Sequence, residues 1–291
     1  MTKIVVLGDL NLDVIAQIPT LPPRGGEVRT TIRTLPGGSA ANFARCVARH
    51  EGIQVTFIGC VGDDPAGRIL VTALAEQGIE MRVKRAPLPT GTIISLADGQ
   101  ERTMLCSRGA NEALDESFID PSWFKAATHL HLSGYSFISP GQAHTASTAM
   151  AIAQAERMTI SLTAPPANLI RKTGIERFLA AIAPVDWLFL NHNEGRALTG
   201  ADTPEGIVDI LARKFAVGAL TLGGAGSLAW KGKTRDRVAI EPLETVDTTG
   251  AGDAFAAGFV ADYLQYRDLN RANRSGIDAA YFLLRDRITP V

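Results

Sequence analysis

The chain has 291 residues, of which 46% are hydrophobic, and its formal net charge at pH 7 is −1. That much apolar sequence can bury a large core, which excludes an intrinsically disordered chain. The even charge balance gives no overall attraction to nucleic acid or to an acidic membrane surface, and we expect neither as a partner. Cys46, Cys60 and Cys106 lie far apart and match no zinc-ligand spacing, which argues against a disulfide framework and a zinc site.

The N-terminal ten residues contain an apolar run that is too short for a signal peptide or a membrane span, so we expect a cytoplasmic protein. Residues 3–8 are apolar and rich in β-branched side chains, which predicts a buried strand. The polar residues Asp9, Asn11 and Asp13 follow it, and ligands of open α/β sheets bind beyond the carboxyl ends of the strands. We predict that these side chains bind sugar hydroxyl groups, although an Asx turn would use the same residues.

Two stretches predict a small sheet apart from the main one. Residues 14–34 are extended and interrupted by proline and glycine, and residues 83–108 contain short strand patterns around an Asp98-Gly99 hairpin signal. We predict that the two stretches pair to form a lid over the site. Arg102 and Arg108 could reach a ligand from this lid, or they could simply be solvated.

A pair of glycines, Gly37 and Gly38, precedes a predicted helix over residues 40–50. Glycine lets a ligand approach the backbone closely, and the amide of Asn42 in the first helical turn could bind a hydroxyl group. The next pattern is a strand over residues 55–59 followed by a helix that ends near Gly78.

The remainder of the chain alternates between strand and helix patterns. Strands are predicted over residues 128–132, 159–162, 187–191 and 219–223, and helices over residues 141–157, 174–182 and 204–215. This alternation predicts a mostly parallel sheet with helices on both faces. Because no repeat or interdomain linker occurs, we predict a single domain over residues 1–291.

Polar or glycine residues also follow two of the later strands. Asn191 and Glu194 could orient water molecules around Mg²⁺, or they could cap a helix. Thr221 with Gly223, Gly224 and Gly226 would let backbone pass close to a nucleotide, or could form a plain hairpin turn.

The most distinctive stretch is residues 247–258, where Gly250, Ala251 and Gly252 precede an apolar helix pattern. Thr248 or Thr249 can cap this helix, and the bare N–H groups of its first turn favour an anion. Asp253 would repel a phosphate, which makes chemical sense if it accepts the proton of a hydroxyl group that attacks the phosphate. In the alternative interpretation, Asp253 only complements the helix dipole.

Four stretches, at residues 8–13, 37–42, 191–194 and 247–253, together resemble the ribokinase-like (PfkB-type) family of sugar and nucleoside kinases. The resemblance extends over nearly the whole chain. It implies a three-layer α/β/α sandwich with a β-sheet lid, and ATP and Mg²⁺ as co-substrate and cofactor. In many members a monovalent cation such as K⁺ also binds.

The resemblance implies a role for each matching residue. Asp253 matches the catalytic base, and Gly250, Ala251 and Gly252 match the anion hole. Asn191 and Glu194 match a motif tied to Mg²⁺ and phosphate, and Asp247 matches a monovalent-cation ligand. The nucleotide-binding positions are Thr221, Gly223, Gly224, Gly226 and Thr249, and the sugar-contacting positions are Asp13, Gly38 and Asn42.

The sequence departs from true ribokinases at two places. Ser39 and Ala40 replace a common Lys-Gly, and Ser133-Gly134 lies where those enzymes place a substrate-binding acid, so ribose is disfavoured. Few residues follow Arg285, so we expect the last loop, which often contacts adenine and the cation, to be short.

We therefore predict an ATP-dependent kinase that phosphorylates a hydroxymethyl group of a sugar, and that dimerises through its lid. Two alternatives stay open: a nucleoside kinase of the same family, and a non-catalytic sugar or nucleotide sensor. A nicotinamide dehydrogenase is excluded because the first strand ends in Gly-Asp-Leu-Asn-Leu-Asp and not in G-x-G-x-x-G.

Overall fold

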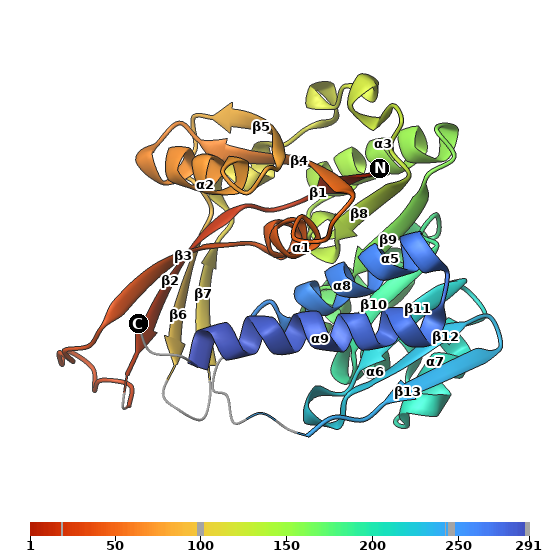
Figure 1. The fold of residues 1–291 in the computed structure, drawn as a ribbon. Helices are drawn as coiled ribbons and strands as arrows, with labels where there is room; N and C mark the ends of the chain where they lie inside the picture. Colours follow the sequence, from red (N-terminus) through yellow and green to blue (C-terminus); the bar gives the residue numbers. More distant parts are fainter. Residues whose placement is uncertain (19, 98–101, 242, 244–247, 289–291) are drawn as a thin grey trace.

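The computed structural model describes residues 1–18, 20–97, 102–241, 243 and 248–288. Within these residues the larger of two sheets has nine strands (Figure 1). Their spatial order is β13 (Thr234–Val238), β12 (Ser227–Lys231), β11 (Val217–Thr221), β10 (Trp187–Asn191), β9 (Thr159–Thr163), β8 (His129–Ser133), β1 (Thr2–Leu7), β4 (Ile53–Gly62) and β5 (Glu80–Ala86).

The strands from β11 to β5 in this order are parallel, and β12 and β13 add an antiparallel edge. The parallel strands are buried in unbroken runs, as expected for a sheet that is covered on both faces. The predicted mostly parallel sheet is therefore confirmed.

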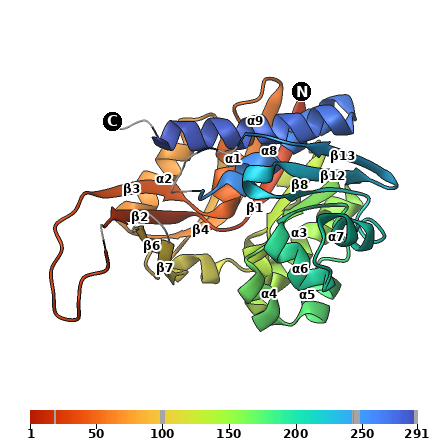
Figure 2. The same cartoon turned by 90° about the horizontal axis from the view of Figure 1, so that it is seen from below.

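Helices cover the two faces of this sheet, and Figure 2 shows the two layers on opposite sides of it. Successive side chains of β1 enter two separate cores, with Ile4 and Val6 in one and Val5 and Leu7 in the other. The first core is closed by α1 (Ser39–Val47), α2 (Pro65–Ala75), α8 (Ala251–Tyr266) and α9 (Leu269–Ile288). The second is closed by α3 (Pro140–Ala155), α4 (Ala167–Thr173), α5 (Ile175–Ala181), α6 (His192–Thr199) and α7 (Pro204–Leu211).

The smaller sheet confirms the expected pairing of two distant stretches. Its order is β3 (Ile32–Gly37), β2 (Asn11–Gln17), β6 (Thr92–Ala97) and β7 (Arg102–Ser107), and β2 runs parallel to β6. Two expectations need correction. Asn11 and Asp13 belong to β2, because their polar side chains alternate with apolar ones along a strand, and residues 83–86 belong to β5 of the larger sheet.

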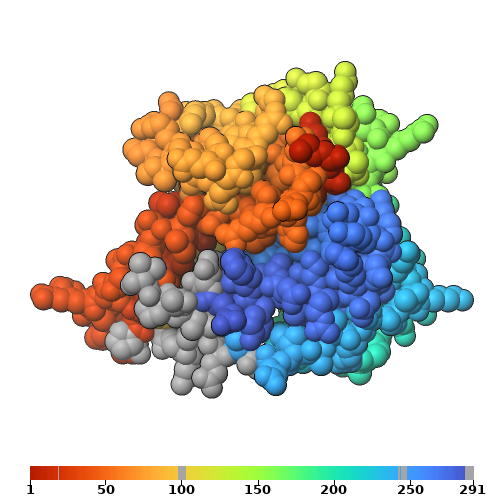
Figure 3. All heavy atoms as spheres, in the orientation of Figure 1, coloured from red at the N-terminus to blue at the C-terminus, as the bar shows by residue number. Residues whose placement is uncertain are grey.

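The helices over residues 141–157, 174–182 and 204–215 are confirmed as α3, α5 and α7. Each helix ends one to four residues earlier than predicted. Two helices, α4 and α9, were not predicted from the sequence. The C-terminal helix α9 contains many charged and amide side chains, but Leu269, Ala272 and Ile277 are buried in the core. In the space-filling view, blue atoms of the C-terminal part fill the surface between the orange and pale-blue regions (Figure 3).

The predicted threonine cap of α8 is wrong. The N-cap residue is Gly250, in the left-handed conformation with φ of 75°, and no side chain caps the helix. Glycine adopts this conformation without steric cost, and the N–H group of Ala251 donates to the backbone oxygen of Thr248 over 3.2 Å. None of the helices in the described part of the chain has the length and apolarity needed to cross a lipid bilayer.

Short 3₁₀ helices connect several elements: η1 (Gly109–Ala113), η2 (Glu116–Phe118), η3 (Pro121–Phe124), η4 (Gly134–Phe137) and η5 (Gly223–Ala225). Of these, η4 follows β8 and η5 follows β11, so both lie at the carboxyl edge of the sheet.

A buried row of polar side chains runs between β8 and β9. His129 contacts the hydroxyl groups of Thr159 and Ser161 at 2.7 and 2.6 Å, and His131 contacts Ser161 at 2.8 Å. The ring of His131 also stacks on Phe43 of α1, with centroids 3.5 Å apart. The row therefore fixes the pairing of β8 with β9 and the position of α1 on the sheet.

These two histidines should make the protein sensitive to acid. Burial lowers the pKa of His129 to about 3 and the pKa of His131 well below its usual value. The unfolded chain therefore binds more protons than the folded one between about pH 6.5 and pH 3, so stability falls as the pH falls through that window. Each group contributes a slope of up to about 1.4 kcal/mol per pH unit.

We expect His129→Gln to lower stability at neutral pH and to flatten this pH dependence, as measured by denaturant unfolding between pH 7 and pH 4. His144→Gln, at an exposed site, serves as the control and should change neither quantity. A variant slope equal to that of the unmodified protein would contradict the assignment.

Candidate functional site

The residues singled out from the sequence gather at one edge of the larger sheet. The parallel strands β1, β10 and β11 end there, and they deliver Asp9, Asn191 and Thr221 to the same edge. The first turns of α1 and α8 also meet, because Ser39 and Asn42 contact Asp253. This edge is where ligands bind in open α/β sheets.

Asp253 lies in the first turn of α8 and is only 8% exposed. The hydroxyl group of Ser39 donates to its Oδ1 over 2.7 Å, and the amide Nδ2 of Asn42 donates to its Oδ2 over 3.2 Å. Both of its oxygens are therefore held by the first turn of α1. Asn42 was predicted to contact a ligand, whereas no role was predicted for Ser39, which differs from the residue common in ribokinases.

The turn before Asp253 has the properties expected of an anion site. The first N–H groups of an α-helix have no partner within the helix, and that end of the helix is positive. A Cβ atom built on Gly252 would meet no atom within 4 Å, so the space beside this residue is open. A Cβ atom on Gly250 would lie 3.0 Å from Nδ2 of Asn42, and its φ of 75° is a conformation that favours glycine.

Asn191 and Glu194 form a capping box at the start of α6. The backbone N–H and the side-chain amide of Asn191 each donate to one oxygen of Glu194 over 2.8 Å. Burial, reinforced by the charge of Asp253, raises the pKa of Glu194 to about 8, against the opposing effect of these hydrogen bonds. The helix-cap interpretation is thus observed, and the carboxyl group also lies close enough to Asp253 to feel its charge.

The donor set at this edge suits a magnesium ion that arrives with a nucleotide. Within the described residues, no group of three or more His, Cys, Asp or Glu side chains could hold a metal ion. Mg²⁺ commonly keeps several water molecules and binds through one or two carboxylates and substrate phosphates. Because both oxygens of Glu194 already accept hydrogen bonds, contact with the ion through water fits this residue.

Asp9 and Arg108 form a buried ion pair with each other. Nη2 of Arg108 lies 3.0 and 2.8 Å from the two carboxylate oxygens, and Nε2 of Gln142 donates to Oδ1 over 3.2 Å. Burial raises the pKa of Asp9, while Arg108 and Gln142 counteract it. Arg108 follows β7 and reaches inward, so it is not a surface arginine of the small sheet. The pair ties the end of β1 to η1 and α3.

The other residues predicted to bind sugar make close contacts within the protein. Oδ1 of Asn11 accepts a hydrogen bond from Asn111 over 2.7 Å. A Cβ atom on Gly37 would overlap the carboxylate of Asp13, and one on Gly38, where φ is 98°, would overlap the backbone oxygen of Asp9. Both glycines are thus required by close approach of protein to protein, whatever ligand binds nearby.

The glycine-rich turn after β11 forms η5 and leads into β12. Gly226, with φ of 91°, packs tightly against Val238 of β13. The backbone N–H of Leu222 donates to the backbone oxygen of Gly226 over 2.8 Å. Gly223 and Gly224 are exposed, and Thr221 and Thr249 are half-buried. The hairpin interpretation therefore describes the turn, and its tip is accessible. Asp247 and the side chain of Arg102 lie outside the described residues.

Tyr135 belongs to the same edge and was missed from the sequence. It lies in η4, directly after β8, and its backbone oxygen accepts from Nη1 of Arg108 over 3.1 Å. Burial raises the pKa of its phenol, and the charges of Asp253, Cys106, Glu194 and Asp9 raise it further. The phenol therefore lies among the candidate carboxylates. A lone aromatic residue one position beyond Ser133-Gly134 was the available signal.

Residues 1–287 match the family model described as pfkB family carbohydrate kinase. The chain is 31% identical to the ATP-dependent ribose-1-phosphate kinase of Halopiger xanaduensis, covering 94% of this chain and 88% of that protein. It is 27% identical to the ribokinase of Lactococcus lactis, with 98% and 91% covered.

Solved structures agree with these relatives. The adenosine kinase of Sinorhizobium meliloti superposes with a TM-score of 0.88 at 26% identity, covering 98% of this chain and 94% of that one. A putative ribokinase II from E. coli in complex with ATP and Mg²⁺ has the same fold, with a TM-score of 0.83 at 23% identity, covering 95% of this chain and 92% of that one.

Proposed function

Because this chain belongs to the PfkB family of carbohydrate kinases, we propose that it transfers the γ-phosphoryl group of ATP to a hydroxymethyl group of a sugar or sugar-like acceptor. The family assignment makes it a sugar or nucleoside kinase, a phosphotransferase with a hydroxyl acceptor. The observation that carries the finer proposal is the placement of Asp253 in the first turn of α8, held by Ser39 and Asn42.

In this proposal Asp253 accepts the proton of the acceptor hydroxyl group as its oxygen attacks the γ-phosphorus atom. Ser39 and Asn42 fix the direction of the carboxylate, so that little reorganisation is needed during the reaction. The N–H groups at the start of α8 stabilise negative charge on the transferred phosphoryl group. The open space beside Gly252 supports this role for the turn.

We propose that Glu194 contacts Mg²⁺ through water, and that Mg²⁺ supplies positive charge to the nucleotide phosphates. Thr221, Thr249 and the exposed tip of the turn at Gly223 and Gly224 are the proposed nucleotide contacts. Asp13, Asn11 and Asn42 are the proposed acceptor contacts, and Tyr135 joins them because it lies among the carboxylates. The small sheet acts as a lid that excludes water, which protects ATP from hydrolysis.

We expect Asp253→Asn to lower kcat by about 10²–10⁴-fold, because the variant keeps its shape but cannot accept the proton. The measurement is an ATP-consumption assay across sugars and nucleosides, with nucleotide binding followed separately by calorimetry. Binding should persist. Asp262→Asn, further along the same helix and paired with Arg271, is the control and should keep its activity. Near-normal turnover by Asp253→Asn would remove this residue from the proposed role.

Ser39→Ala should lower kcat by about tenfold or more, because it removes a hydrogen bond to a charged group, while KM for ATP stays unchanged. Ser39→Thr keeps a hydroxyl group and should recover part of the loss. Ser147→Ala on the surface of α3 is the matched control. An unchanged kcat in Ser39→Ala would show that the contact is dispensable.

We also propose that the small sheet mediates a homodimer. Ile94 and Leu105 are paired on neighbouring strands and are 39% and 58% exposed. Val14 pairs with Ile94 on the other side, so the three side chains form an apolar row. Asp13, next to Val14 on the strand, points to the opposite face. Exposed apolar rows of this kind favour association with a second copy.

The expected mass in solution is twice the chain mass of 31.0 kDa, as measured by light scattering after size exclusion. Leu105→Lys should give a monomer, because a charged side chain would then be buried at the interface. Ile69→Lys, at an exposed apolar position of α2, should leave the mass unchanged. A monomeric unmodified protein would rule out this interface.

A further inference from the structure

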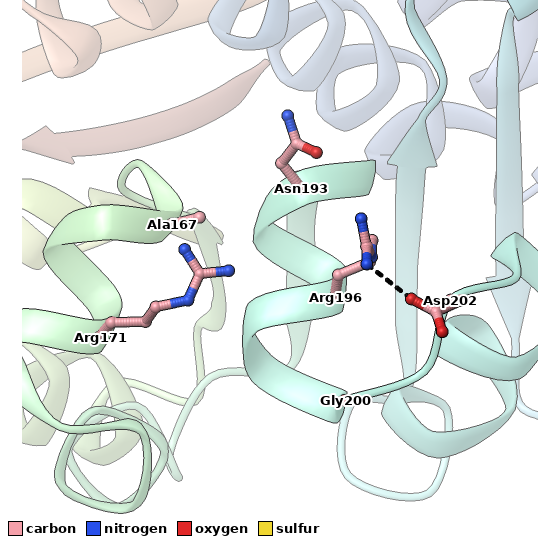
Figure 4. Close-up of a pocket in the computed structure, with 6 residues that line it drawn as sticks. All are labelled: Ala167, Arg171, Asn193, Arg196, Gly200 and Asp202. Atoms are coloured by element: carbon pink, nitrogen blue, oxygen red, sulfur yellow. Dashed lines mark ion pairs between the residues drawn. The ribbon is translucent and has the colours of Figure 1, made fainter.

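A cavity of about 430 Å³ lies between α4 and α6, apart from the residues of the proposed active site. Its size is within the range of small-molecule sites in proteins. Figure 4 shows its lining, with Arg171 extending from α4 toward α6 and Arg196 lying next to Asp202. Ala167, Asn193 and Gly200 complete it.

The charges of the lining leave the cavity positive. Nη2 of Arg196 lies 2.7 Å from Oδ1 of Asp202, and both side chains are largely exposed. Within the described residues, the guanidinium group of Arg171 forms no hydrogen bond or ion pair. One guanidinium charge is therefore uncompensated. An exposed ion pair contributes little to stability, so Arg196 can turn toward a ligand at little cost.

We propose that this cavity binds the phosphoryl group of a small molecule, held between Arg171 and Arg196. The guanidinium fork matches the oxygen geometry of a phosphoryl group and forms two charge-assisted hydrogen bonds to it. Asn193 adds a neutral amide donor on the same side of α6, and the absence of side-chain bulk at Ala167 and Gly200 leaves room for the ligand. The packing of α4 against α6 holds the two arginines on a common frame.

The source of the phosphoryl group is either free inorganic phosphate or a sugar phosphate. Asp202 and Asn193 can exchange hydrogen bonds with hydroxyl groups, which only the sugar phosphate carries. The proposal concerns binding and does not depend on the role of Asp253. Asn193 lies in the first turn of α6 beside Glu194, so a ligand in the cavity contacts the helix that carries the proposed Mg²⁺ residue.

The test is calorimetric titration of the full chain with inorganic phosphate and, separately, with ribose 5-phosphate. We expect saturable binding of inorganic phosphate that Arg171→Gln weakens about tenfold or more, because hydrogen bonds to a charged guanidinium are lost. Arg196→Gln provides a second variant with the same expectation. Tighter binding of ribose 5-phosphate, lost in the same variants, identifies the sugar phosphate as the source, and equal binding identifies inorganic phosphate.

Arg177→Gln is the matched control, since Arg177 is an exposed arginine on the adjacent helix α5 and does not line the cavity. It removes the same charge and should leave binding unchanged. Phosphate could also bind at the start of α8, but that binding would be the same in all three variants. No saturable binding, or binding that Arg171→Gln and Arg196→Gln leave intact, would overturn the proposal.

Discussion

The hydrogen bonds from Ser39 and Asn42 to Asp253 are the contacts on which the site depends. They join the first turns of α1 and α8, although Ser39 and Asp253 are 214 residues apart in the sequence. A carboxylate at a helix start is favoured by the helix dipole but would swing freely without further partners. With both oxygens held, its direction is set by the packing of two helices on one sheet. The position of the Asp253 carboxylate therefore depends on how precisely α1 is packed against the sheet.

The position of α1 is fixed by buried side chains of the sheet. Phe43, one residue after Asn42, stacks on His131 of β8, and His131 is tied through Ser161 to His129. Neutral imidazoles can form this row because burial disfavours their charged forms. A row of polar groups inside a core is stable only when its members are paired, so it tolerates few alternative positions of α1. Because Phe43 packs on this row, the row also fixes the position of the first turn of α1, where Ser39 and Asn42 lie.

The sequence predicted what is periodic or local, and it failed where contacts are distant. Strands such as Trp187–Asn191 follow from unbroken apolar runs, and the start of α8 follows from its glycines. Asn11 and Asp13 were misplaced because two polar residues after a strand look alike whether they form a turn or begin a new strand. The Asp9–Arg108 pair and the Ser39–Asp253 contact join residues that no local pattern relates. Tyr135 could not be assigned to the site from the sequence, because only the fold brings the acidic side chains close to it.

The charge at the carboxyl edge limits what the site can accept. Burial and the charge of Asp253 raise the pKa of Glu194 to about 8, so a second negative charge is disfavoured beside Asp253. A nucleotide phosphate alone would add negative charge beside two carboxyl groups and increase the repulsion. A divalent cation reverses that balance, because it favours the ionised form of Glu194 and compensates the phosphates at the same time. The arrangement is thus better suited to a nucleotide that arrives with its own metal ion than to the nucleotide alone.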